Sequence, residues 1–223
     1  MNSFTIQSNE YLTKNIQGYY HQDYTTFGAE GNPDFINHLK NQFGDTSPLI
    51  LQKAQTELKR ILEEDFLKIK NIYPDKHLTV CVIPRAKTES SYSVNQKLFK
   101  KVVEEVANKL SGFSNGTDYI IRQRNTRTTH MNRSGYGGDG DMPYPGITND
   151  TCKISPEIKG KDILLIDDIY TKTINIDEDA IQALLEKGAK SVVFYSVGKT
   201  KSRSLNFPPS ASSSPSNTDD LPF

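Results

Sequence analysis

The stretch that decides the fold reads ILLIDDIYTKTIN and spans residues 163–175. Its first four residues are apolar in succession, which is typical of a strand buried on both faces of a parallel sheet. Asp167 and Asp168 follow at the carboxyl end of that run, and a hydroxyl-rich loop then leads into a predicted helix over residues 176–187. A second apolar run at residues 191–197 completes a strand–helix–strand unit, which predicts a right-handed crossover.

The sequence upstream of this unit predicts more of the same architecture. Residues 78–83 form a continuous, β-branched run that Pro84 ends, and residues 94–110 place apolar side chains at helical spacing. A short strand is expected at residues 118–121. Together these patterns predict an α/β fold with a mainly parallel sheet flanked by helices, in a domain over residues 76–203.

Residues 1–75 are interpreted as an N-terminal extension. Aromatic and Thr-rich runs in residues 1–30 favour strands and turns. Asn32-Pro33 is a favourable start for a short helix that Gly44 ends, and Ser47-Pro48 starts a long amphipathic helix that stops before Pro74. We expect the long helix to cover one face of the sheet.

Two stretches show no hydrophobic period. Residues 122–156 are rich in Gly, Thr, Asn and Arg and are long for a simple connection, so they are expected to form a mobile functional flap. Residues 204–223 are rich in Ser, Pro and Asn, which predicts a disordered tail.

The composition limits the possible function classes. Basic and acidic residues both total 27, so the chain carries no net charge that would gather nucleic acid, and any such contact must be local. Cys81 and Cys152 lie far apart, which fits neither a zinc site nor a disulfide framework. Without an apolar run long enough to span a membrane, the chain is expected to be soluble and cytoplasmic.

The paired acids and the loop that follows them suit a phosphorylated sugar. Ligands of open α/β sheets sit at the carboxyl ends of the strands, where a helix N-terminus binds phosphate. Adjacent carboxylates accept hydrogen bonds from the vicinal hydroxyls of a ribose. The alternative is an ordinary turn between a strand and a helix, with a carboxylate that caps the helix.

This segment resembles the signature of the type I phosphoribosyltransferases. The resemblance implies that Asp167 and Asp168 contact the ribose hydroxyls of phosphoribosyl diphosphate. It also implies a phosphate-binding loop made by Tyr170, Thr171, Lys172, Thr173 and Asn175. Mg²⁺ would be the cofactor, held mainly by the diphosphate and ribose oxygens, and no metal-ligating residue of the protein is predicted.

The loop departs from the family's usual Thr-Thr-Gly-x-Thr pattern. Lys172 and Thr173 stand where Thr and Gly are common, and Asn175 replaces the last Thr. A glycine lets the backbone approach a phosphate, so Thr173 implies a different loop path or a weaker site, which the charge of Lys172 could offset. The acids at residues 177–179 are expected to favour the helix dipole rather than face a phosphate.

A second segment resembles the competence protein F (ComF)-like and amidophosphoribosyltransferase-like branch of that family. Residues 83–87 read IPRAK, and YSVNQ at residues 92–96 precedes a helix. The resemblance implies that Arg85, Ala86 and Lys87 contact the diphosphate, the alternative being a solvated basic loop. The branch's basic flap is loosely matched by Arg122, Arg124 and Thr126, together with His130 and Arg133.

The last residues form a separate motif. Asp219, Asp220, Leu221, Pro222 and Phe223 are similar to the acidic tip of bacterial single-stranded DNA-binding proteins. A terminal aromatic ring on a flexible tether can fill a pocket while the acids meet a basic rim. The tip is therefore predicted to bind a DNA-repair or helicase protein, and an incidental tail is the alternative.

These features predict a phosphoribosyltransferase-like protein that binds phosphoribosyl diphosphate with Mg²⁺ and acts in DNA processing, uptake or defence. As a glycosyltransferase it would displace diphosphate from the anomeric carbon with a nitrogenous acceptor. Two alternatives stay open: a non-catalytic module that senses a nucleotide or phosphoribosyl diphosphate and recruits DNA machinery through its tail, and a nucleobase salvage enzyme. The edge strands and the long helix also permit a homodimer.

Overall fold

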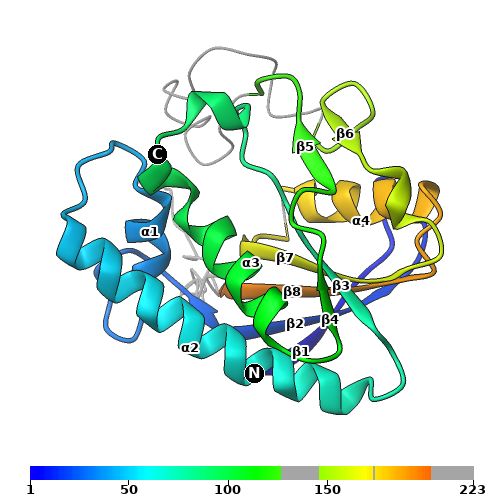
Figure 1. Ribbon diagram of the computed structural model, residues 1–223, viewed down its shortest axis with the longest axis horizontal. Helices are drawn as coiled ribbons and strands as arrows, with labels where there is room; N and C mark the ends of the chain where they lie inside the picture. Colours follow the sequence, from blue (N-terminus) through cyan, green and yellow to red (C-terminus); the bar gives the residue numbers. More distant parts are fainter. Residues whose placement is uncertain (127–145, 173, 202–223) are drawn as a thin grey trace, which may run out of the picture.

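A six-stranded sheet organises the chain in the computed structural model, which describes residues 1–126, 146–172 and 174–201 (Figure 1). The strands lie in the order β1-β2-β8-β7-β3-β4. They are β1 (Asn2–Ile6), β2 (Ile16–Tyr24), β3 (Leu78–Val82), β4 (Phe113–Asn115), β7 (Asp162–Tyr170) and β8 (Ser191–Thr200). Every neighbouring pair is parallel except β1 with β2, so the predicted α/β fold with a mainly parallel sheet is confirmed.

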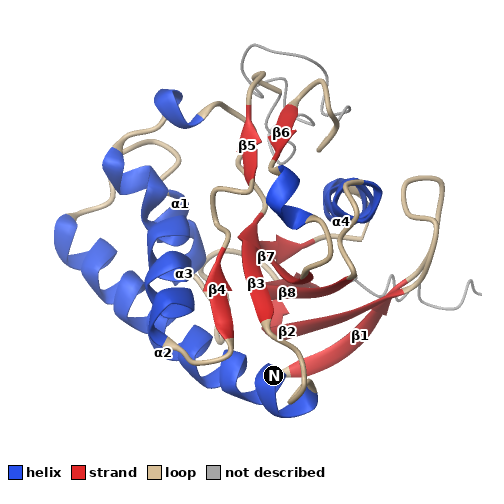
Figure 2. Cartoon of the chain, turned by 45° about the vertical axis from the view of Figure 1, so that its right-hand side comes forward, coloured by secondary structure: helices blue, strands red, loops and turns tan. Residues whose placement is uncertain are grey.

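Helices cover both faces of this sheet, as Figure 2 shows. One face carries α1 (Phe35–Lys40), α2 (Pro48–Ile72) and α3 (Leu98–Lys109), and the other carries α4 (Ile176–Glu186). Side chains of a strand point alternately to the two faces. Leu164 and Ile166 of β7 accordingly join the core beneath α2 and α3, while Ile163 and Leu165 join the core beneath α4.

The N-terminal residues belong to this same sheet and core. Strand β2 lies between β1 and β8, and α2 buries Leu58, Leu62 and Phe66 completely. Ser47 caps α2 by accepting a hydrogen bond from the Ile50 amide, as the Ser47-Pro48 start signal predicts. The segment interpreted as an N-terminal extension is therefore continuous with the architecture of residues 76–201.

Strand β7 is longer than the apolar run at residues 163–166. It continues to Tyr170 because residues 167–170 remain paired with β8, where Asp167 is opposite Ser196 and Tyr170 is opposite Lys199. Asp167 and Asp168 thus lie within the last residues of the strand. Strand pairing fixes their backbone more firmly than a loop would.

The predicted flap is described only at its two ends. There β5 (Ile120–Arg122) and β6 (Cys152–Ile154) form a separate antiparallel pair, followed by the 3₁₀ turn η4 (Pro156–Ile158). Residues 127–145, with His130 and Arg133, lie outside the described residues, as does the predicted tail at residues 204–223. Neither β4 nor β6 was predicted from the sequence; each is a strand of three residues.

The described residues include no membrane-spanning helix and no reactive cysteine. None of their helices is long and apolar enough to cross a membrane. Cys81 and Cys152 are both buried free thiols, and burial raises the pKa of Cys81 to about 12. Neither thiol is therefore a nucleophile at neutral pH.

Candidate functional site

The sheet has a topological switch point between β3 and β7. The connection from β3 runs through α3 on one face to β4, and the connection from β7 runs through α4 on the other face to β8. Because the two chains leave neighbouring strands in opposite directions, a crevice opens beyond the carboxyl ends of these strands. Ligands of open α/β sheets bind in that position.

A cavity of about 190 Å³ lies at this switch point, and we call it the first cavity. Its walls include the ends of β3 and β7, the loop after Pro84 and the start of α3. The charged lining residues are Lys40, Arg85, Lys87, Lys97, Lys100 and Arg122 against Glu89, Asp167 and Asp168. Six cationic groups face three acidic groups, so the formal charge of the lining favours an anionic ligand.

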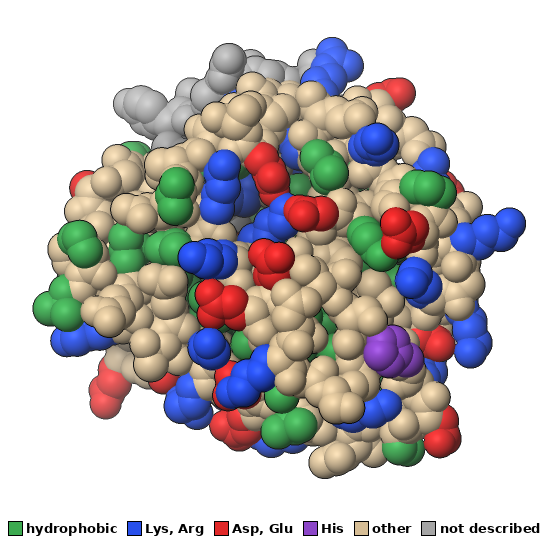
Figure 3. Space-filling model, in the orientation of Figure 1, with side chains coloured by type: hydrophobic (Ala, Val, Ile, Leu, Met, Phe, Trp, Pro, Cys, Tyr) green, Lys and Arg blue, Asp and Glu red, His purple; other side chains and the backbone are tan. Residues whose placement is uncertain are grey.

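This local excess of positive charge contrasts with the molecule as a whole. On the face seen in Figure 3, Lys and Arg side chains lie among Asp and Glu side chains rather than in one patch. That mixture agrees with the equal totals of basic and acidic residues. An anion would therefore be selected by the cavity itself and not by the field of the whole surface.

The two predicted acids lie together on the floor of the first cavity. The ammonium group of Lys40, at the end of α1, is 3.0 Å from Oδ1 of Asp168. Burial and the neighbouring charge of Asp168 raise the pKa of Asp167 to about 7, although Lys40 opposes that shift. Asp167 therefore changes its charge near neutral pH.

A third acid lies behind the two acids of the cavity and does not line the cavity itself. Asp177, in the first turn of α4, is only 4% exposed and hydrogen-bonds to the carboxyl of Asp167. Burial and Asp167 raise the pKa of Asp177 well above its usual range. Two carboxyl groups can share a hydrogen bond only if one holds a proton, so Asp177 is more than a charge that favours the helix dipole.

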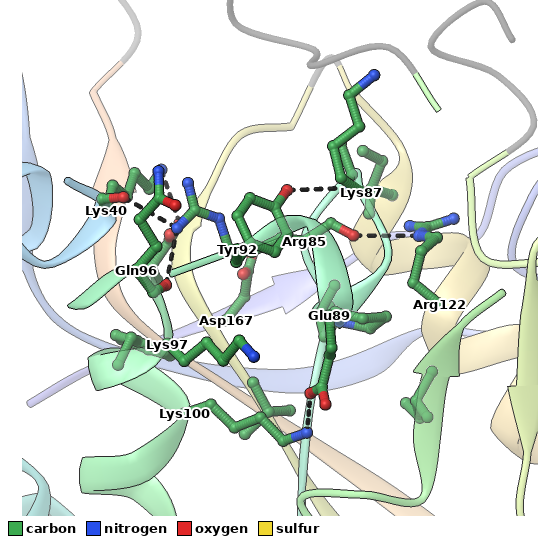
Figure 4. A pocket seen from close by; sticks show the side chains of 18 of the residues that line it. Lys40, Arg85, Lys87, Glu89, Tyr92, Gln96, Lys97, Lys100, Arg122 and Asp167 are labelled. Atoms are coloured by element: carbon green, nitrogen blue, oxygen red, sulfur yellow. Dashed lines mark hydrogen bonds and ion pairs between the residues drawn. The ribbon is translucent and has the colours of Figure 1, made fainter. Parts of the chain in front are cut away.

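The loop after Pro84 is held by Arg85, as Figure 4 shows. Its guanidinium donates to the backbone oxygens of Lys40 (2.9 Å) and Gln96 (2.8 Å) and lies 4.3 Å from the ring centroid of Tyr92. Arg85 thus fixes the loop against α1 and the 3₁₀ turn η2 (Val94–Lys97). The Lys87 side chain points away from Asp167, and the amide of Lys87 donates to the Tyr92 hydroxyl at 3.0 Å.

The other end of this loop is bonded to the residues around the end of β5. The Arg122 side chain donates from Nε to the Arg85 oxygen (3.1 Å) and from Nη1 to the Gly146 oxygen (2.8 Å). The amide of Thr126 donates to the Ala86 oxygen at 2.8 Å. These bonds hold Ala86 by its backbone at the wall of the cavity.

Arg122 is a buried cation without a described counter-ion. It is 4% exposed, and burial lowers the pKa of its guanidinium. No carboxylate in residues 1–126, 146–172 or 174–201 pairs with it, and Lys97 makes no ion pair within those residues either. Lys100, by contrast, pairs with Glu89 and Asp118. Arg122 and Lys97, with Arg85, whose guanidinium meets only neutral oxygens, therefore contribute uncompensated positive charge to the lining.

The predicted phosphate loop follows β7, and its side chains contact different parts of the protein. Thr171 shares a hydrogen bond of 2.8 Å with the Thr200 hydroxyl, and Asn175 accepts one from the Asn9 amide at 3.1 Å. Asn175 has a φ of 59°, a left-handed conformation that asparagine tolerates. Lys172 lies near the buried Glu178, where its charge opposes the raised pKa of that acid.

None of the four described residues of the predicted phosphate loop, Tyr170, Thr171, Lys172 and Asn175, lines the first cavity. Tyr170 is 4% exposed, packs against Phe4 and Phe194 on the α4 side, and donates to Glu178 at 2.9 Å. Thr171 lines a separate cavity. Thr173 lies outside the described residues.

No family model matches this chain, and no curated protein matches it significantly. Of the predicted residues, Asp167, Asp168, Arg85, Ala86 and Lys87 share the first cavity.

Sequence reasoning did not place Lys40, Lys97 or Asp177 in the site. Lys40 comes from a segment without a recognisable motif, and it reaches Asp168 only because α1 packs beside α2 and α3. Asp177 had a signal, because it lies ten residues after Asp167 across a tight strand-to-helix loop. With a loop this short, the first turn of the helix lies beside the end of the strand, so an acid there can face Asp167.

Proposed function

We propose that the first cavity binds phosphoribosyl diphosphate and that the protein is a phosphoribosyltransferase-like protein. The observation that supports this most is the pair Asp167 and Asp168 at the carboxyl end of β7, beside the switch point, in a cavity with a cationic lining. Vicinal carboxylates suit vicinal hydroxyls, and the cationic lining suits the phosphates.

In this proposal, each part of the ligand has a counterpart in the cavity. The ribose hydroxyls donate to Asp167 and Asp168, and the diphosphate lies toward the backbone of residues 85–88 in the field of Lys97 and Arg122. The guanidinium of Arg85 holds the loop in place, since its donors already meet protein oxygens. The 5-phosphate lies toward the N-terminus of α4, whose first residue, Ile176, lines the first cavity.

The described residues contain no group of three metal-ligating side chains. In this proposal Mg²⁺ would be held mainly by oxygens of the ligand, and it would neutralise part of the diphosphate charge. In the transfer reaction, a nitrogen of the acceptor forms a bond to the anomeric carbon as the bond to diphosphate breaks. The chain's own contribution is to orient the ribose and to stabilise the leaving diphosphate.

Calorimetric titration of phosphoribosyl diphosphate with Mg²⁺ tests this proposal. We expect saturable binding to the wild type and a loss of at least about tenfold in affinity for the Asp167→Asn, Asp168→Asn double variant. A matched control changes the exposed Asp75 and Asp150 to Asn, which alters the net charge equally away from the cavity. Equal affinity in the site variant and the control contradicts the proposal.

A second candidate function is a sensor that binds phosphoribosyl diphosphate or a nucleotide without turnover. It is favoured by the loop, where Thr171 and Asn175 already use their side chains for bonds within the protein. An assay for diphosphate release separates the candidates. Binding without release over a range of nitrogenous acceptors supports the sensor, while release with a nucleobase supports the salvage alternative.

The proposed setting in DNA processing, uptake or defence depends on residues 219–223, which lie outside the described residues. In this proposal the tip binds a DNA-repair or helicase protein. A synthetic peptide of the last residues should bind that partner, and removal of Phe223 should abolish the binding. A shortened peptide that binds as tightly as the full one contradicts this role.

A further inference from the structure

We propose that a second cavity, on the other side of Lys40, binds the planar heteroaromatic ring of a nucleobase that carries an exocyclic amino group. This cavity has a volume of about 660 Å³. It is distinct from the first cavity, although Lys40 and Gln42 line both. The inference goes beyond the proposed function, since it concerns a separate ligand site.

The second cavity occupies a position where α/β proteins bind ligands. Its floor lies at the carboxyl ends of three parallel strands. Tyr24 is the last residue of β2, Thr200 is the last residue of β8, and Ile169 and Thr171 lie at the end of β7. The first cavity lies at the ends of β3 and β7. Both therefore open along the same edge of the sheet, which is the functional edge of this architecture.

The walls of the second cavity are aromatic. Tyr24, Phe27, His38 and Phe43 line it, and the rings of Phe27 and His38 meet edge to face with centroids 5.8 Å apart. Phe27 is 59% exposed and Phe43 is 80% exposed, so their faces are accessible to a ligand. Aromatic side chains stack on nucleobases of any kind because every base has a flat π face.

Polar groups at the same cavity supply recognition of the ring edge. The Asp45 carboxylate lines the cavity and has no hydrogen bond or ion pair within the described residues. A carboxylate is a pure acceptor, so it selects ring substituents that donate, such as an exocyclic amino group. Lys40 lines both cavities, so its ammonium group lies beside a ligand bound in either one.

The test uses adenosine, which has a base but no phosphate, and follows its binding to the full chain by ligand-observed NMR. We expect saturable binding to the wild type and at least tenfold weaker binding to the Phe27→Ala, Phe43→Ala variant, because each stacking contact contributes about fivefold or more. Purine riboside, which lacks the 6-amino group, should bind more weakly than adenosine to the wild type. That difference should vanish in Asp45→Ala.

Two controls separate binding in the second cavity from unspecific apolar binding and from binding in the first cavity. Leu49→Ala with Leu67→Ala removes exposed apolar side chains from α2 and should leave adenosine binding unchanged. The Phe27→Ala, Phe43→Ala variant should still bind phosphoribosyl diphosphate with Mg²⁺ as the wild type does, because neither ring lines the first cavity, so failure of the first site and failure of the second are distinguishable. The inference is overturned if adenosine does not bind the wild type, or if the aromatic variant binds it as tightly as the control.

Discussion

Asp167 and Asp177 make the free energy of unfolding depend on pH, because their two carboxyl groups share a proton in the folded chain. Both acids have a raised pKa in the folded chain, Asp167 near 7, so between about pH 4 and 7 the folded state holds protons that the unfolded state has lost. Stability contributed by these groups is present at low pH and falls as the pH rises through that window. The Oδ1 atom of Asp177 is buried and has no hydrogen-bond partner in the described residues, which adds to the cost of its ionised form.

Asp177→Asn should remove the free-energy cost of ionising a buried carboxyl group. The Asn amide can donate to Asp167 at every pH, so the variant should gain stability over the wild type on the order of 2 kcal/mol above pH 7 and little near pH 4. Urea unfolding of both proteins at pH 4.5 and pH 8 measures the difference. A gain that is the same at both pH values contradicts the shared proton.

At the scale of elements, the loop at residues 84–88 joins three parts of the fold. Arg85 ties it to the end of α1 and to η2, and Arg122 and Thr126 tie it to β5 and the residues that follow. These contacts link segments that are 45 and 37 residues apart in sequence. The loop is thus a fixed wall of the first cavity, although its sequence alone is equally typical of a solvated basic loop.

Arg85→Ala should lower stability by about 2 kcal/mol, because two backbone oxygens lose a charged donor and Tyr92 loses its cation–π partner. The same variant should weaken binding of phosphoribosyl diphosphate. Thermal unfolding followed by circular dichroism measures the first effect. Lys87→Ala removes the same charge from the same loop, and an equal loss of stability in both variants argues against the positioning role of Arg85.

At the scale of the whole molecule, residues 1–75 are needed to complete the fold. Strand β2 covers the edge of β8, and α1 and α2 bury Ile36, Leu39, Leu58 and Phe66 in the core beneath the sheet. Lys40 reaches the first cavity from the same segment. Removing residues 1–75 would expose both an unpaired strand edge and a large apolar face.

A fragment of residues 76–201 is therefore expected to show no cooperative thermal transition, while a chain of residues 1–201, which keeps every described element, should unfold cooperatively. Differential scanning calorimetry of both fragments makes the comparison. A sharp transition in the shorter fragment would show that residues 1–75 are dispensable for folding.

The sequence was sufficient for features that follow from local patterns. The apolar runs predicted β3, β7 and β8, and the Ser47-Pro48 signal predicted the start of α2. The sequence could not show that β2 lies beside β8, because strand pairing at a separation of about 175 residues leaves no local trace. For the same reason Lys40 was missed, and the burial of Tyr170 was missed because the extra length of β7 depends on its pairing with β8.

The most direct test of the central claim is a crystal structure of the protein with phosphoribosyl diphosphate and Mg²⁺. We predict density for the ribose in the first cavity, with its two hydroxyls about 2.6–3.0 Å from carboxylate oxygens of Asp167 and Asp168. Ligand density that lies elsewhere, or a ribose that contacts neither acid, would contradict the account.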